Sequence, residues 1–179
     1  MGLKKLIILD RDGVINQDSL EYIKSPEEFI LLPGSCEAIA RLNAAGFLVA
    51  VVTNQSGSAR GLYNEAQLEA IHDKMRAAMA AVGGRIDLVL HCPHMPNAGC
   101  NCRKPKPGML YEVAKQLGCP LEGVPLFGDR VSDVEVALTV GASPRIVLSP
   151  MGDRPDFLRY PDVPVFASLA EGVEQLLNS

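Results

Sequence analysis

The sequence predicts an α/β protein built on a doubly wound, mostly parallel sheet with helices on both faces. Short apolar runs of strand length alternate with longer segments of helical periodicity along most of the chain. The first two runs, 6–9 and 47–52, are continuously apolar, which is typical of strands buried on both faces. Polar residues come directly after three of the runs, as they do at the carboxyl edge of an open parallel sheet. Together these observations indicate a Rossmann-like architecture.

The elements can be placed one after another along the chain. Strands are expected at 6–9, 47–52, 86–90, 124–127 and 145–148. Helices are expected between Ser35 and Gly46 and over the ranges 64–82, 108–117, 131–140 and 169–177. A short helix is expected to start after Ser25, which forms a capping-box pattern with Glu28. Because no repeat, linker or low-complexity tract interrupts the order, residues 1–179 are expected to form a single domain without a large cap domain.

Composition narrows the possible partners. The 179 residues carry a net charge of −4 and are 47% hydrophobic, which is ordinary for a globular protein. The acidic balance argues against a general binder of nucleic acid or of anionic membranes. No apolar run has membrane-spanning length, and the run after Lys5 is too short for a signal peptide. A cytoplasmic, monomeric protein that acts on a small molecule is therefore expected.

Two aspartates follow the first predicted strand and form the first candidate site. In extended geometry Asp10 and Asp12 lie on the same side of the chain, so both could face one ligand. Two neighbouring anions repel, and Mg²⁺ suits such oxygen ligands. An ordinary Asp-Gly turn is the alternative for these two residues alone. Thr53-Asn54 and Gly128-Asp129 end two other predicted strands, which favours a shared site at one sheet edge.

The segment around Asp129 has a rival interpretation as a phosphate-binding loop. Gly123 and Gly128 have P-loop spacing, but Asp129 stands where the lysine is required, so a Walker-type nucleotide site is excluded. Asp129 is interpreted as a metal ligand, whereas Asp133 could instead serve as a helix N-terminal acid. The basic run 103–107 contains two prolines that stiffen it, and Lys104 could bind a phosphoryl oxygen there.

Cysteine and histidine residues gather in the irregular segment 91–107. Cys92, His94, Cys100 and Cys102 supply three thiolates and an imidazole, a set that suits a closed tetrahedral Zn²⁺ site. A labile disulfide and unrelated thiols remain alternatives, because the spacing is tighter than the common C-x₂-C. A structural zinc would fold a loop that has no core of its own and would aim the basic run that follows. His72 is interpreted as a surface or partly packed histidine, not a ligand.

These motifs together resemble those of the haloacid dehalogenase superfamily of phosphotransferases. The four superfamily motifs are matched by Asp10-Arg11-Asp12-Gly13, by Thr53, by Lys104, and by Asp129 with Asp133. Longer stretches resemble the bacterial D-glycero-D-manno-heptose 1,7-bisphosphate phosphatases, namely 9–13, 53–57, 60–61, 92–94 and 100–105. The histidinol-phosphate phosphatases share these motifs and remain an alternative. The loop 95–99 is shorter than in some family members, which leaves the substrate preference and the sugar anomer open.

The resemblance implies an Mg²⁺-dependent hydrolase that removes the C7 phosphate of heptose 1,7-bisphosphate, in the biosynthesis of ADP- or GDP-heptose for lipopolysaccharide or a related surface polysaccharide. Asp10 would be the nucleophile that forms an aspartyl-phosphate, and Asp12 the general acid and base. Thr53 and Lys104 would stabilise the phosphoryl group. A non-enzymatic, zinc-stabilised binding module is the alternative from another class.

The resemblance also implies the ligands of the catalytic metal and the contacts of the substrate. Mg²⁺ would bind Asp10, the backbone carbonyl of Asp12 and Asp129, with Asp133 behind them. Arginine side chains suit the second phosphate of a bisphosphate through paired N–H donors. The residues expected to contact the substrate are Arg11, Asp18, Asn54, Gln55, Ser56, Arg103 and Arg130.

Overall fold

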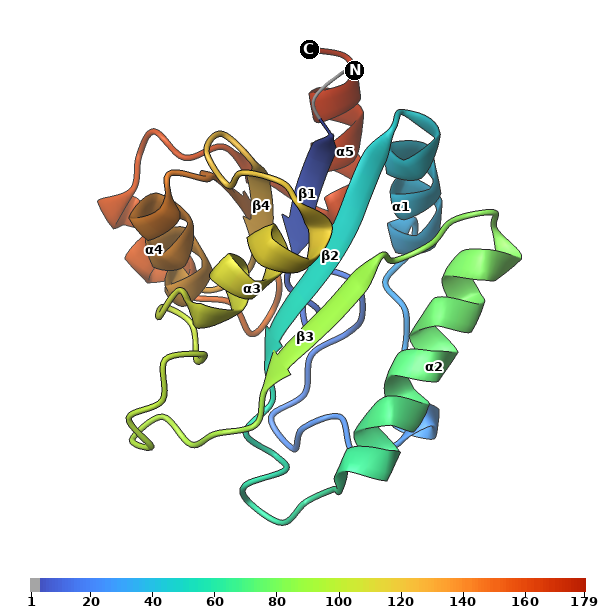
Figure 1. The fold of residues 1–179 in the computed structure, drawn as a ribbon, viewed down its shortest axis with the longest axis vertical. Coiled ribbons are helices and arrows are strands. Elements are labelled where there is room, and N and C mark those ends of the chain that lie inside the picture. Colours follow the sequence, from blue (N-terminus) through green and yellow to red (C-terminus); the bar gives the residue numbers. More distant parts are fainter. Residues whose placement is uncertain (1–3) are drawn as a thin grey trace.

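The computed structural model describes residues 4–179, which form one six-stranded sheet with helices on both faces (Figure 1). All strand pairs are parallel, in the order β3-β2-β1-β4-β5-β6. The strands are β1 (Lys5–Leu9), β2 (Phe47–Asn54), β3 (Leu88–Cys92), β4 (Pro125–Gly128), β5 (Ser143–Val147) and β6 (Val165–Phe166). The predicted fold class is confirmed. The strand β6 is additional to the five predicted ones, because two residues are too few to give a recognisable pattern.

Five α-helices cover the sheet, and the sequence predicts each of them to within a few residues. They are α1 (Ser35–Ala44), α2 (Glu65–Ala81), α3 (Gly108–Leu117), α4 (Val131–Val140) and α5 (Leu169–Leu177). Short 3₁₀ helices occupy Pro26–Glu28 and Arg154–Arg159. The capping box predicted at Ser25 is wrong, since the Ser25 side chain makes no cap hydrogen bond. A capping box does start α2, where Asn64 and Gln67 bond to each other's backbone N–H.

Alternation along the strands divides the interior into two cores. Ile7 and Leu9 of β1 point to the face covered by α1, α2 and α5, while Leu6 and Ile8 point to the face covered by α3 and α4. In Figure 1 α1 and α2 lie on one side of the sheet, and α3 and α4 lie on the other. This burial on both faces explains why the central strands read as continuous apolar runs.

Because every strand is parallel, the polar residues that follow them meet at one edge. Asp10 follows β1 and donates its backbone N–H to the carbonyl of Phe127 in β4, at 2.9 Å. Gln55 follows β2 and donates its backbone N–H to the carbonyl of Cys92 at the end of β3, at 2.7 Å. The strand β3 lies two residues further along than the predicted 86–90, so Cys92 belongs to the sheet. Within residues 4–179, the model contains no helix with both the length and the apolar character needed to cross a bilayer.

Candidate active site

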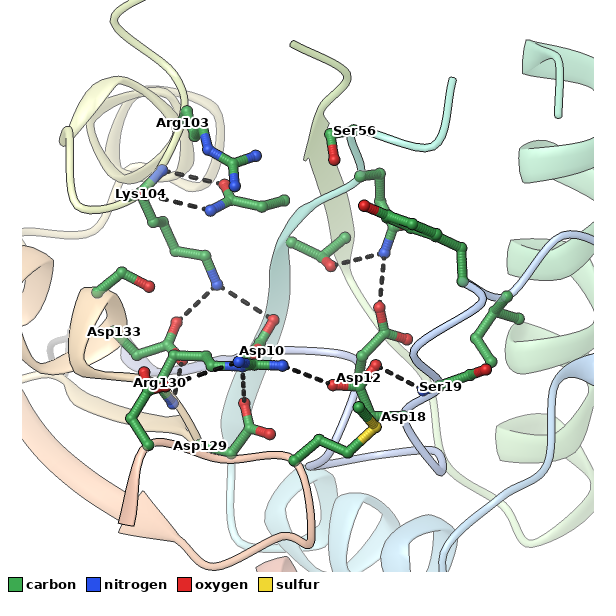
Figure 2. Close-up of a pocket in the computed structure, with 18 of the residues that line it drawn as sticks. Asp10, Asp12, Asp18, Ser19, Ser56, Arg103, Lys104, Asp129, Arg130 and Asp133 are labelled. Atoms are coloured by element: carbon green, nitrogen blue, oxygen red, sulfur yellow. Dashed lines mark hydrogen bonds and ion pairs between the residues drawn. The ribbon is translucent and has the colours of Figure 1, made fainter. Parts of the chain in front are cut away.

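A polar cleft of about 450 Å³ opens at the carboxyl edge of the sheet (Figure 2). It collects the side chains that follow β1, β2 and β4, together with the loop that precedes α3. Twelve of the lining residues are predicted site residues: Asp10, Asp12, Asp18, Thr53, Asn54, Gln55, Ser56, Arg103, Lys104, Asp129, Arg130 and Asp133. Asp10 and Asp133, which lie 123 positions apart in the sequence, therefore meet here, as the shared edge of a parallel sheet predicts.

Three buried carboxylates form the floor of one half of the cleft. Asp10, Asp129 and Asp133 each offer an oxygen, and these oxygens all lie within 4.8 Å of one another. Burial, followed by the charge of Asp133, raises the pKa of Asp10 well above its usual value. Burial and Asp133 likewise raise the pKa of Asp129 to about 7. The Oδ1 atom of Asp129 is buried without a hydrogen-bond partner, so this group fits a bound cation.

Lys104 is the cation that the protein itself supplies to these carboxylates. Its Nζ lies 3.1 Å from Oδ1 of Asp10, 2.7 Å from Oδ1 of Asp133 and 2.9 Å from the carbonyl oxygen of Val52. Burial opposes the charge on Lys104, but Asp10 and Asp133 outweigh it and raise the pKa of the ammonium. Figure 2 shows the Lys104 side chain reaching from its loop to both carboxylates.

Asp12 occupies a different electrostatic environment from Asp10, although only one residue separates them. Its Oδ1 accepts from Nε and Nη2 of Arg11 and from Nδ2 of Asn16, at 2.9–3.0 Å. Its Oδ2 accepts from Nε2 of Gln55 at 3.0 Å. Burial alone would raise the pKa of Asp12, but the charge of Arg11 and these hydrogen bonds lower it. The two aspartates are therefore shifted in opposite directions, which favours different chemical roles.

Arg11 and His72 are placed differently from their predictions. The side chain of Arg11 is fully buried and does not line the cleft, so the geometry does not favour its predicted contact with substrate, which stays a prediction. Its guanidinium lies over the ring of Phe29 and pairs with the carboxylate of Asp12 instead. His72 is 2% exposed and contacts Arg11 within the interior, so it is not a surface residue. The helical spacing of His72 in the sequence does not by itself distinguish a surface position from a buried one.

The residues after β2 hold the cleft together as well as lining it. The Asn54 side chain accepts from the backbone N–H of Lys104 at 3.0 Å and donates to its carbonyl at 3.1 Å. Asn54 thus fastens the basic loop to β2, and its amide is already engaged without substrate. Gln55 donates to Oγ1 of Thr53 at 2.9 Å and accepts from the Tyr63 hydroxyl at 2.8 Å. Ser56 lies on the same rim of the cleft.

The two arginines predicted to bind substrate, Arg103 and Arg130, differ in how strongly other side chains of the protein hold them. Arg103 has one hydrogen bond from its guanidinium among the described residues, a 3.3 Å contact to the carbonyl of His94. Arg130 instead bonds Asp18 at 3.0 Å and lies 3.6 Å from Asp153. Its guanidinium is thereby held by acids of the protein. The geometry consequently favours Arg103 over Arg130 as a group available to a substrate anion.

The four predicted zinc ligands converge between β3 and α3. Their ligand atoms all lie within 4.8 Å of one another. The Nδ1 of His94 lies 3.4 Å from Sγ of Cys92 and 3.2 Å from Sγ of Cys102. All four cysteine and histidine side chains point to one centre, and no disulfide joins the cysteines of the described chain. The set fits a tetrahedral metal, and Arg103 and Lys104 follow it directly in the sequence.

Several residues of the site give no signal in the sequence. Ser149 donates to Oδ2 of Asp129 at 2.6 Å, and Asn16 bonds Asp12 from a loop with no period. Tyr63 reaches the cleft only through Gln55. Gly13 is the exception, because it directly follows the Asp motif. It has a φ of +84°, and a side chain there would collide with the carboxylate of Asp129.

Comparison with known proteins identifies related sequences and structures. The family model described as HAD-hydrolase-like matches residues 101–172, and the model described as polynucleotide kinase 3 phosphatase matches residues 5–123. The D-glycero-beta-D-manno-heptose-1,7-bisphosphate 7-phosphatase of Pseudomonas putida is 55% identical over 84% of this chain and 86% of that protein. The enzyme of the same name from Bordetella bronchiseptica is 54% identical over 80% of each chain.

Solved structures agree with the sequence relatives. The D,D-heptose 1,7-bisphosphate phosphatase of B. bronchiseptica, complexed with magnesium and phosphate, superimposes with a TM-score of 0.90 at 48% identity, over 97% of this chain and 98% of that one. The corresponding Burkholderia thailandensis enzyme gives a TM-score of 0.74 at 39% identity, over 98% of this chain and 100% of that one.

The buried charge balance predicts the effect of replacing Lys104. In Lys104→Met the stem of the side chain remains, but Asp10 and Asp133 lose their cation. With a chelator present, the free energy of unfolding at pH 7 should fall by about 3 kcal/mol, as when one partner of a buried pair is removed. Urea unfolding followed by circular dichroism measures this change. Lys115→Met, at an exposed position of α3, is the matched control, and equal stabilities of the two variants would contradict the prediction.

Proposed function

The chain belongs to the D-glycero-beta-D-manno-heptose-1,7-bisphosphate 7-phosphatase family of haloacid dehalogenase-like phosphomonoester hydrolases, and we propose how its cleft performs that reaction. The substrate is heptose 1,7-bisphosphate, which loses its C7 phosphate in the biosynthesis of ADP- or GDP-heptose for surface polysaccharide. One observation carries the proposed mechanism. Asp10 and Asp12 lie in the same cleft in opposite electrostatic environments, and of these two aspartates Lys104 pairs with Asp10.

Asp10 is the proposed nucleophile. One of its carboxylate oxygens attacks the phosphorus, the bond from phosphorus to the C7 oxygen breaks, and an aspartyl-phosphate forms. Asp12 protonates the departing sugar oxygen and then takes a proton from the water that hydrolyses the aspartyl-phosphate. A dianionic phosphate bound beside Asp12 would raise the pKa of this carboxyl, which favours the protonated form that the first step requires.

Lys104 and Thr53 are proposed to hold the phosphoryl oxygens. The ammonium of Lys104 already lies beside Asp10, so an incoming phosphate would meet a positive charge there. Thr53 is buried at the end of β2 and lines the cleft. Both groups are fixed before substrate arrives, and fixed donors stabilise developing charge without reorganising during the reaction.

Magnesium is the proposed catalytic metal, held by Asp10 and Asp129, with the backbone carbonyl of Asp12 as a further ligand and Asp133 behind them. The group fits because three buried carboxylates converge and one oxygen of Asp129 lacks a hydrogen-bond partner. When bound, the ion would neutralise negative charge so that an anionic nucleophile can approach an anionic phosphate. The B. bronchiseptica structure with magnesium and phosphate supports this choice.

Zinc is the proposed structural metal, held by Cys92, His94, Cys100 and Cys102. Three thiolates and one imidazole complete a tetrahedral site without an open position, so zinc would not take part in the chemistry. The loop between β3 and α3 contributes little to either core except through the partly buried Cys100 and Cys102. A metal there would therefore fix the backbone that carries the two basic residues after Cys102.

Arg103 is proposed to bind the phosphate that does not react. It lines the cleft next to Lys104, and its guanidinium has donors free to form paired hydrogen bonds with a second dianion. Arg130 is expected to contribute less, because Asp18 and Asp153 already hold it. Asp18, Asn54, Gln55 and Ser56 complete the proposed substrate contacts.

The alternatives weighed from the sequence are not favoured. A histidinol-phosphate phosphatase would share the catalytic motifs, but the relatives reported above are named as phosphatases of the heptose bisphosphate. Their names specify the beta anomer, and we propose the same anomer here. A non-enzymatic module would not need Asp10 and Lys104 in this arrangement. The monomeric state and the cytoplasmic location stay predictions.

The nucleophile assignment predicts that Asp10→Asn abolishes turnover while the protein remains folded. An amide cannot attack phosphorus and is a poorer Mg²⁺ ligand, so release of inorganic phosphate should fall by at least about a hundredfold. Asp12→Asn should also be severely impaired, but it retains Asp10 and should therefore accumulate the phosphoenzyme, which mass spectrometry can detect. More than about a hundredth of wild-type turnover in Asp10→Asn would remove Asp10 from the role of nucleophile.

The zinc assignment predicts about one tightly bound zinc per chain in freshly purified protein, measured by elemental analysis. Cys102→Ala should lower the zinc content, the melting temperature and, through loop disorder, the turnover. Cys119→Ala is the matched control, because Cys119 is a buried cysteine outside the cluster. Zinc-free wild-type protein prepared without chelators would argue against the site, whereas turnover should still depend on added Mg²⁺.

The recognition role predicts a substrate-dependent effect of Arg103→Ala. The value of kcat/KM for heptose 1,7-bisphosphate should fall by about tenfold or more, because the second phosphate loses its partner. Hydrolysis of 4-nitrophenyl phosphate should change little, since that substrate has no second phosphate. Arg85→Ala, an exposed arginine before β3, serves as the control. Similar losses on both substrates would assign Arg103 to the reacting phosphate or to the loop fold.

A further inference from the structure

A buried arginine lies directly behind the carboxylate of Asp12. The guanidinium of Arg11 is inaccessible to solvent and directs two of its nitrogens, Nε and Nη2, at Oδ1 of Asp12. Two donors held in one rigid guanidinium plane fix the position of this oxygen more closely than a single lysine ammonium could. The orientation of Asp12 therefore depends on the orientation of Arg11.

His72 supplies the partner for the third nitrogen of that guanidinium. Its Nε2 lies 3.1 Å from Nη1 of Arg11, and the histidine is 2% exposed on α2. Burial, followed by the charge of Arg11, lowers the pKa of His72 to about 3, so the ring is neutral and Nε2 can accept. Arg11 and His72 are 61 positions apart in the sequence, and the contact joins α2 to the segment after β1.

The two oxygens of Asp12 are consequently used in different ways. Oδ1 accepts three hydrogen bonds, two from Arg11 and one from Asn16. Oδ2 accepts one, from Gln55, whose own carbonyl oxygen accepts from the hydroxyl of Tyr63. Oδ1 is thus saturated within the protein, whereas Oδ2 retains a lone pair for a group in the cleft.

We propose that His72 is a positioning residue for the reaction: it fixes the guanidinium of Arg11, which anchors Oδ1 of Asp12 and leaves Oδ2 to exchange the proton with the leaving group. The inference rests on the proposed role of Asp12 as general acid. Without an acceptor at position 72, Nη1 of a buried guanidinium is left unpaired, and the fork on Asp12 is free to rotate toward another partner. A small misplacement of the acid then slows proton transfer.

The experiment compares two substrates that differ in their need for a proton. The sugar oxygen of heptose 1,7-bisphosphate must be protonated as it leaves, whereas 4-nitrophenolate leaves from its phosphate ester unaided. The measured quantity is kcat/KM, which covers the steps up to release of the leaving group and excludes hydrolysis of the phosphoenzyme. His72→Phe removes the acceptor, and His72→Gln restores one. Met75→Leu, one turn along the buried face of α2, controls for altered packing.

His72→Phe should lose about tenfold or more in kcat/KM on the bisphosphate and less than about threefold on 4-nitrophenyl phosphate. His72→Gln and Met75→Leu should remain within about threefold of wild type on both substrates. An equal loss on both substrates, no loss at all, or a His72→Gln variant as defective as His72→Phe would overturn the proposal. If circular dichroism shows that His72→Phe does not fold, Arg11→Lys, which keeps the charge but lacks the fork, must show the same selective loss.

Different results of these assays test the proposed function and the positioning role of His72. Wild-type protein that releases no phosphate from the bisphosphate, or Asp12→Asn that loses equally on both substrates, would refute the proposed reaction or the acid role of Asp12. A selective loss in Asp12→Asn that is absent from both His72→Phe and Arg11→Lys would refute the positioning role alone.

Discussion

The structure of the site depends on one electrostatic constraint: three buried carboxylates, after β1, after β4 and in the first turn of α4, must be neutralised. Asp10, Asp129 and Asp133 bring their oxygens within 4.8 Å of one another in the interior, where like charges cannot remain unbalanced. Lys104 supplies one positive charge directly to Asp10 and Asp133. Oδ1 of Asp129, which has no hydrogen-bond partner, leaves a place for a metal cation. Charge balance thus ties the position of Lys104 to that of the three carboxylates.

The loop that carries Lys104 has to be held from both ends, because it contains no regular secondary structure before α3. Asn54 bonds both backbone groups of Lys104, which connects the loop to the end of β2. On the other side, Cys100 and Cys102 converge with Cys92, which belongs to β3. The cysteine cluster and the asparagine therefore serve the same end as the ion pairs: they place one ammonium group beside one carboxylate.

Asp10 and Asp12 show how one short motif can place two carboxylates in different electrostatic environments. Asp10 is surrounded by carboxylates and a lysine, whereas Asp12 faces a guanidinium and two side-chain amides. Their pKa values are consequently displaced in opposite directions, a pattern typical of paired nucleophile and acid–base groups. For Asp10 the shift comes from burial and from the carboxylates of the cleft, whereas for Asp12 the largest lowering cause is Arg11, which lies behind the cleft.

The sequence by itself determined the α/β class, the five helices and the composition of the site. Short continuous apolar runs that alternate with helical segments indicated strands buried on both faces, and parallel strands bring Asp10, Thr53 and Asp129 to one edge. Only the tertiary structure decided how individual side chains are used. Arg11 and His72 pair inside the protein across 61 positions, and Arg130 is held by Asp18 across 112. Such contacts leave no local periodicity or spacing, because they depend on which faces of distant elements pack together.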